Sequence, residues 1–256
     1  GTATSNITEI DVAGAGSDTA NATTGAVALN AIGDRAKLSE LEINSNGGVT
    51  LDTVLVDNSP SSLLDIDLDE GAAGATLTAN ALTSGSMTVD GTGTDDTIDI
   101  NDDVTSGAAL TIQNAASVDL GDNVDLTGTS VAVTSNVTAI DLDGTGTNII
   151  TATATTVALS AIADTGDVTE LQIDAGTGVT LDTVTLNSLP AALLDINFDS
   201  TDAGSTLAAN AISAGAITVD GSATGADTAN FNSTVTSTNT SIDITNGLPW
   251  PNSTQV

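Results

Sequence analysis

The chain has 256 residues, and its 34 acidic against 2 basic side chains give a formal net charge of −32. It contains no His, Cys or Tyr, which excludes disulfides, Cys or His metal sites and catalysis by an imidazole. Arg35 and Lys37 are too few to bind phosphates, so we expect no nucleic-acid partner. Hydrophobic residues make up 39% of the chain, which favours a folded protein over an acidic disordered one. No apolar run approaches the roughly 18 residues of a membrane span.

Short β-strands are predicted along most of the chain. Apolar and polar residues alternate in many brief stretches, among them residues 41–43, 49–51, 64–68, 98–100 and 140–142. This period of two is typical of a strand with one buried face. The stretches recur roughly every 8 to 13 residues and are separated by Gly, Asn, Asp, Ser and Thr, the residues of turns. The sequence therefore predicts an all-β protein.

An internal duplication organises these strands. Val-Thr-Leu-Asp-Thr-Val at residues 49–54 recurs at residues 179–184, an offset of 179 − 49 = 130. The same offset relates further segments, namely 63–66 to 193–196, 79–81 to 209–211 and 88–91 to 218–221. We therefore predict a first β repeat over residues 1–135 and a second over residues 136–256, which ends in a tail containing Pro and Trp.

Two architectures fit short strands at this spacing. One is a parallel β-solenoid, or β-helix, with two or three strands and about 22 to 25 residues per coil. The other is a pair of tandem β-sandwich domains. Residues 130–140 at the junction of the copies show the pattern of an unbroken strand, with no Pro- or Gly-rich linker. The core is also aliphatic and nearly free of aromatic rings, so the sequence favours the solenoid.

One group of acidic residues lies on a predicted strand. Asp65, Asp67 and Asp69 alternate with Ile66 and Leu68, so their carboxylates project from one face while the aliphatic residues enter the core. Carboxylates so close together repel one another and favour either open water or a divalent cation such as calcium, which takes six to eight oxygen ligands. A solvated acidic face is the alternative interpretation.

A second acidic group combines a predicted loop with the strand that follows it. Its members are Asp95, Asp96, Asp99, Asp102 and Asp103. The glycines of Gly-Thr-Gly-Thr-Asp at residues 91–95 permit left-handed turns that direct oxygen atoms towards one point. A simple tight turn between coils is the alternative. We expect calcium to stabilise the fold, first through Asp95, Asp96 and Asp99 and second through Asp65, Asp67 and Asp69.

The Thr-, Ala-, Asp-, Val- and Gly-rich texture of residues 49–54 and 91–99 resembles that of secreted bacterial S-layer and RTX-adhesin proteins. Members of that class form parallel β-rolls and β-helices that bind calcium, so the resemblance implies a calcium-binding surface protein. The tandem Gly-Gly-x-Gly-x-Asp nonapeptides of RTX proteins are absent. Viral fibre proteins share the same texture and are the alternative.

The sequence predicts a non-enzymatic structural protein, extracellular or at the cell surface, that assembles head to tail into a homopolymeric filament or surface layer. An adhesin or viral fibre module that binds a glycan or a cell surface is the alternative. A carboxylate hydrolase is disfavoured because sugar sites usually contain aromatic and basic side chains. The chain carries Asn-x-Ser/Thr sequons of a candidate glycoprotein at Asn6, Asn21, Asn136, Asn232, Asn239 and Asn252.

Overall fold

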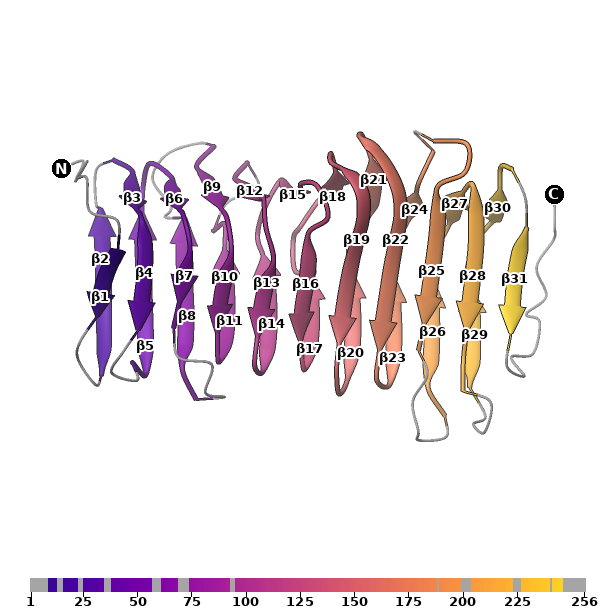
Figure 1. The fold of residues 1–256 in the computed structure, drawn as a ribbon. Helices are drawn as coiled ribbons and strands as arrows, with labels where there is room; N and C mark the ends of the chain where they lie inside the picture. Colours follow the sequence, from indigo (N-terminus) through magenta and orange to yellow (C-terminus); the bar gives the residue numbers. More distant parts are fainter. Residues whose placement is uncertain are drawn as a thin grey trace. The chain divides into compact units, whose positions relative to one another are not determined.

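The structure is a computed structural model. It describes residues 9–12, 16–22, 25–34, 38–56, 61–68, 74–92, 95–187, 189–198, 204–222, 227–239 and 241–245. Within these ranges the secondary structure consists of 31 β-strands and no helix (Figure 1). The predicted all-β class is therefore confirmed.

The chain forms two compact units, Gly1–Asp119 with Val133–Thr138 and Leu120–Ala132 with Ala139–Val256. The first unit contains three sheets. In sheet order their strands are β1 (Glu9–Val12), β4 (Ala31–Asp34), β7 (Val54–Leu55), β10 (Leu82–Ser84) and β13 (Val104–Ser106); β2 (Ser17–Ala22), β5 (Glu40–Ser45), β8 (Leu63–Leu68), β11 (Ser86–Asp90) and β14 (Ala109–Gln113); and β3 (Val27–Leu29), β6 (Val49–Leu51), β9 (Thr76–Ala79), β12 (Thr97–Ile100) and β15 (Ser117–Leu120).

The second unit is built in the same way from three sheets. Their strands are β16 (Asp125–Gly128), β19 (Thr145–Ala152), β22 (Asp167–Ala175), β25 (Leu193–Asn197), β28 (Ala216–Asp220) and β31 (Ile242–Thr245); β17 (Ser130–Val133), β20 (Thr156–Leu159), β23 (Gly178–Leu181), β26 (Thr206–Ala209) and β29 (Thr228–Phe231); and β18 (Ala139–Leu142), β21 (Ile162–Asp164), β24 (Val184–Thr185), β27 (Ile212–Ala214) and β30 (Val235–Ser237).

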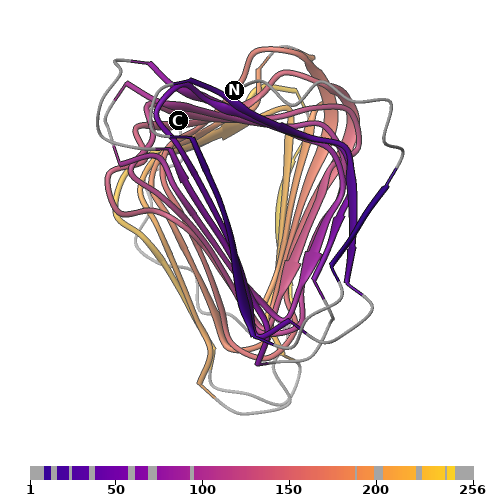
Figure 2. The same ribbon diagram turned by 90° about the vertical axis from the view of Figure 1, so that its left-hand side faces the viewer.

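Each of the strands β1 to β28 pairs with the strand three places later in the chain, as a solenoid with three strands per coil requires. Thr76 pairs with Thr97, 97 − 76 = 21 residues later. Val49 pairs with Leu77, 77 − 49 = 28 residues later. Because the described ladders are parallel, the predicted solenoid is confirmed and the antiparallel sandwich alternative is wrong. Viewed end on, the coils of each unit surround a triangular core (Figure 2).

Aliphatic side chains from successive coils stack in register inside each unit. On β8, Leu64, Ile66 and Leu68 are fully buried, while the alternate positions face outwards. Leu64 lies between Leu41 of the preceding coil and Met87 of the following one. Burial of each such side chain contributes roughly 1.5–3 kcal/mol. The alternation that predicted strands in the sequence therefore also decides which carboxylates reach the surface.

The duplication is visible strand by strand. β1 to β14 correspond in order to β18 to β31, an interval of 18 − 1 = 17 strands, and β15 to β17 lie between the two series. Since three strands make one coil, 17 strands are five coils and two strands. Corresponding strands therefore hold different places within their coils. Their burial patterns nevertheless agree, since half-buried and buried residues alternate along both β8 and β25.

Candidate functional site

Outward carboxylates of neighbouring coils lie side by side in the first unit. Register places Glu42 of β5 beside Asp65 of β8, and Asp67 of β8 beside Asp90 of β11. Paired strands are about 4.8 Å apart. Asp65 and Asp67 therefore belong to a larger surface, which we call the first acidic face. It comprises Glu40, Glu42, Asp65, Asp67 and Asp90.

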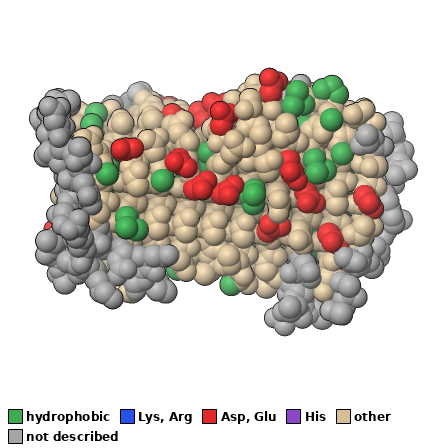
Figure 3. All heavy atoms as spheres, in the orientation of Figure 1, with side chains coloured by type: hydrophobic (Ala, Val, Ile, Leu, Met, Phe, Trp, Pro, Cys, Tyr) green, Lys and Arg blue, Asp and Glu red, His purple; other side chains and the backbone are tan. Residues whose placement is uncertain are grey.

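The second unit carries the corresponding surface on β22, β25 and β28. The second acidic face comprises Glu170, Asp174, Asp195 and Asp220, which occupy the duplicated positions of Glu40, Asn44, Asp65 and Asp90. Arg35 and Lys37 lie outside the described residues, so the described part of the chain has no Lys or Arg. The space-filling view accordingly shows acidic side chains and no basic ones on the face it presents (Figure 3).

Each face raises the pKa of one carboxyl group, and the causes are the same in both. Burial raises the pKa of Asp65, and the negative charges of Glu40, Glu42 and Asp90 raise it further. Burial likewise raises the pKa of Asp195, and Glu170, Asp174 and Asp220 add to the effect. Both shifts have the sign expected of carboxylates that have acidic neighbours and no compensating cation.

An acid–amide pair next to these carboxylates differs between the faces. In the first face, Asn44 Nδ2 donates a hydrogen bond to Glu42 Oε1 at 2.9 Å. In the second, Gln172 Nε2 donates to Asp174 Oδ2 at 2.8 Å. The acid and the amide have thus exchanged positions. One oxygen atom in each pair, Asn44 Oδ1 in the first and Asp174 Oδ1 in the second, is buried and accepts no hydrogen bond from a described residue.

Asp96 of the predicted loop group holds two coils together. Its side chain is 3% exposed, and its Oδ1 accepts a hydrogen bond from the backbone N–H of Ala75 at 2.7 Å. Asp227 occupies the matching position of the second copy, where the offset lengthens by one residue to 227 − 96 = 131. It accepts hydrogen bonds from the backbone N–H groups of Ser205 at 2.8 Å and Ser222 at 2.6 Å. This anchoring contact was not predicted from the sequence, although the matched aspartates of the two copies signal it.

The remaining members of the loop group spread along β12 and the turn after it. Asp95 is exposed before the strand, and Asp99 is half-buried on it. Asp102 is exposed in the turn, where its Oδ1 accepts a hydrogen bond from the backbone N–H of Asp103 at 2.8 Å. Asp69 lies outside the described residues. Within the described ranges, no three acidic side chains converge to hold a metal ion, and calcium binding stays a prediction.

Comparisons of the chain with protein-family models, curated proteins and solved structures find no match in any of the three. In the part of the chain that the structure describes, no helix has the length and apolar character needed to cross a membrane.

Proposed function

We propose that this is a non-enzymatic structural protein that acts outside the cell or at its surface and assembles head to tail with copies of itself into a filament or surface layer. The observation that supports this proposal is the unpaired edge of the strands at each end of the three sheets. Within the described residues, β1, β2 and β3 each have a ladder partner on one side only, and so do β29, β30 and β31. An open strand edge presents N–H and C=O groups that another strand can pair with.

β2 shows which groups such a contact would use. Ala22 O accepts a hydrogen bond from the backbone N–H of Asn46 at 3.2 Å, so Ala22 directs its backbone groups towards β5. Because these groups alternate in direction along a strand, Asn21 and Thr19 direct theirs to the other side. A second copy of the chain would satisfy them by strand addition. A contact between unlike surfaces of identical chains then propagates unless it closes into a ring.

Charge opposes this assembly. A net charge of −32 makes two copies repel each other, and salt or a divalent cation reduces that repulsion. We therefore propose that polymers form more readily in millimolar calcium than in a chelating buffer. This dependence requires only that calcium neutralises charge, so it does not depend on any one of the predicted calcium sites.

The edge is tested with Asn21→Pro, because proline removes the outward N–H group of β2 while the ladder to β5 keeps its hydrogen bonds. Asn21→Ala is the matched control. Sedimentation velocity and electron microscopy should show polymers for the unmodified chain and the control, and mainly monomers for Asn21→Pro. An unmodified chain that stays monomeric in calcium would contradict the proposal. Polymers of Asn21→Pro as long as the control's would exclude the β2 edge from the contact.

A further inference from the structure

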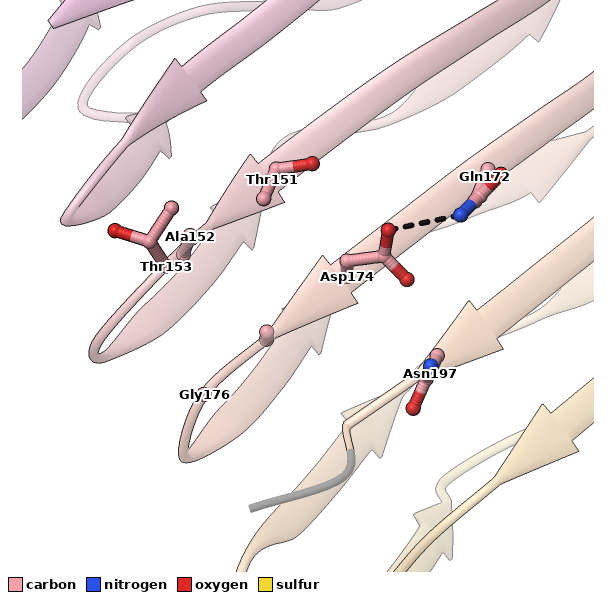
Figure 4. A pocket seen from close by; sticks show the side chains of 8 residues that line it. Thr151, Ala152, Thr153, Gln172, Asp174, Gly176 and Asn197 are labelled. Atoms are coloured by element: carbon pink, nitrogen blue, oxygen red, sulfur yellow. Dashed lines mark hydrogen bonds between the residues drawn. The ribbon is translucent and has the colours of Figure 1, made fainter. Parts of the chain in front are cut away.

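A hollow of about 320 Å³ opens on the second unit at the end of β22. Its polar lining comes from three neighbouring strands and the turn that follows β19, through Thr151, Thr153, Gln172, Asp174 and Asn197. Figure 4 shows Asp174 between Thr151 and Asn197, with Gln172 beside it on the same strand. The hollow is large enough for a chemical group of a small molecule or of a partner's side chain.

Three oxygen atoms of this hollow have unused hydrogen-bond acceptor capacity. Asp174 Oδ2 accepts from Gln172 Nε2, whereas Asp174 Oδ1 is buried and accepts no hydrogen bond. Gln172 Oε1 and the hydroxyl oxygen of Thr151 also accept none from the described residues. A buried carboxylate oxygen without a donor costs free energy until a donor or a cation reaches it. The hollow therefore favours a ligand that supplies several donors.

The surrounding charges restrict the ligand further. Asp174 faces the same surface as Glu170, Asp195 and Asp220, and the described residues include no cation to balance them. An anionic group is repelled by this surface, and a neutral hydroxyl gains nothing from the field. A protonated primary amine carries three N–H donors, one positive charge and no acceptor. These properties complement three unused acceptors in a negative field.

We propose that the hollow beside Asp174 binds a primary ammonium group, with Asp174 Oδ1 as the charged acceptor and Gln172 Oε1 and the Thr151 hydroxyl as neutral ones. The ammonium group is either the side chain of a lysine in a partner protein or the end of a free polyamine. The matching place in the first unit has Asn44 instead of Asp174. Its buried unpaired oxygen is neutral, so this function belongs to the second copy.

NMR titration of the ¹⁵N-labelled chain tests the proposal. The probes are Nα-acetyl-lysine amide, the same compound acetylated at Nε, spermidine and calcium chloride. We expect the lysine compound to shift the signals of the Gln172 side-chain amide and the Gly176 backbone amide, and its Nε-acetylated form to leave them in place. Tighter binding of Nα-acetyl-lysine amide than of spermidine identifies the lysine side chain of a partner protein, and the reverse order identifies a free polyamine.

The variant Asp174→Asn should weaken lysine binding about tenfold or more, as expected for loss of a hydrogen bond between charged groups. Asp167→Asn is the control, because it removes the same charge from an exposed position at the other end of β22 and should leave the affinity unchanged. Equal losses in both variants would show that only the general field attracts amines. Equal binding of the acetylated probe, or displacement of the lysine compound by equimolar calcium, would also overturn the proposal.

Discussion

The two acidic faces preserve one interaction with its partners exchanged. Glu42 accepts from Asn44 in the first face, whereas Asp174 accepts from Gln172 in the second. Each pair has one carboxylate and one amide, two residues apart on the same side of a strand. Two carboxylates there would repel each other, and two amides would lose the charge-assisted hydrogen bond. The duplicated sequence therefore retains one charge and one donor, and the strand position of each is free to change.

The two faces also differ in how charge is spaced across the coils. In the first face, Asp67 and Asp90 are carboxylates on adjacent strands. In the second, Asn197 lies between Asp174 and Asp220 and separates their charges. The first face thus concentrates charge between neighbouring coils, while the second leaves one carboxylate oxygen unpaired beside a hollow. The same architecture consequently supports different surface chemistry in its two copies.

The largest expected effect compares the cores of the copies at one position. Leu68 and Phe198 are related by the offset of 130, and both are fully buried. Phe198→Ala should reduce the free energy of unfolding by about 3–5 kcal/mol and Leu68→Ala by about 2–5 kcal/mol. Urea unfolding followed by circular dichroism measures both. A loss below about 1 kcal/mol at Phe198 would indicate that the surrounding coils collapse into the space left by the ring.

The next effect concerns the buried aspartates that join coils. Asp96 accepts a hydrogen bond from the backbone N–H of Ala75, and Asp227 accepts hydrogen bonds from those of Ser205 and Ser222. Each buried N–H group left unpaired costs about 1–3 kcal/mol. Asp96→Ala and Asp227→Ala should therefore each destabilise the chain. Asp95→Ala, at an exposed neighbour, is the control in a chelating buffer. Equal effects of Asp227→Ala and Asp95→Ala would contradict the anchoring role.

Much of the fold was predictable because one pattern decides it. Alternation gives the strands, the offset of 130 gives the duplication, and the alternating Asp65 and Asp67 do share a face. The neighbours of these aspartates were not predictable, because the interval between paired residues varies from 21 to 28. Without that interval, Glu42 cannot be placed beside Asp65. The burial of Asp96 was missed because an aspartate beside a Gly-rich turn has the same sequence pattern whether it binds an ion or a backbone N–H group.

A smaller effect tests the exchanged pair itself. Asn44→Asp places a second carboxylate beside Glu42 and removes its donor, so we expect the free energy of unfolding to fall. The double variant Glu42→Gln with Asn44→Asp recreates the pair of the second face and should recover most of that loss. A double-mutant cycle from urea unfolding measures the coupling. Additive effects of the two substitutions would show that the pair does not constrain the sequence.

The smallest effect is the pH dependence that Asp65 confers on the first face. Its pKa is raised in the folded chain, so folding favours the protonated form. The stabilising contribution is present below the unfolded pKa of about 3.9 and is lost as the pH rises through the folded pKa. Asp65→Asn, which is neutral throughout, should therefore exceed the unmodified chain in stability at pH 7, and this advantage should disappear as the pH falls towards about 4.

Because the Asp65 carboxyl group is partly exposed, we expect a difference in the free energy of unfolding of only about 0.2–1 kcal/mol. Urea unfolding in a chelating buffer at both pH values measures it. Asp102→Asn serves as the control, since the amide oxygen can still accept from Asp103 and the position lies outside the acidic face. If Asp65→Asn gives no advantage over this control at pH 7, repulsion within the face does not oppose folding.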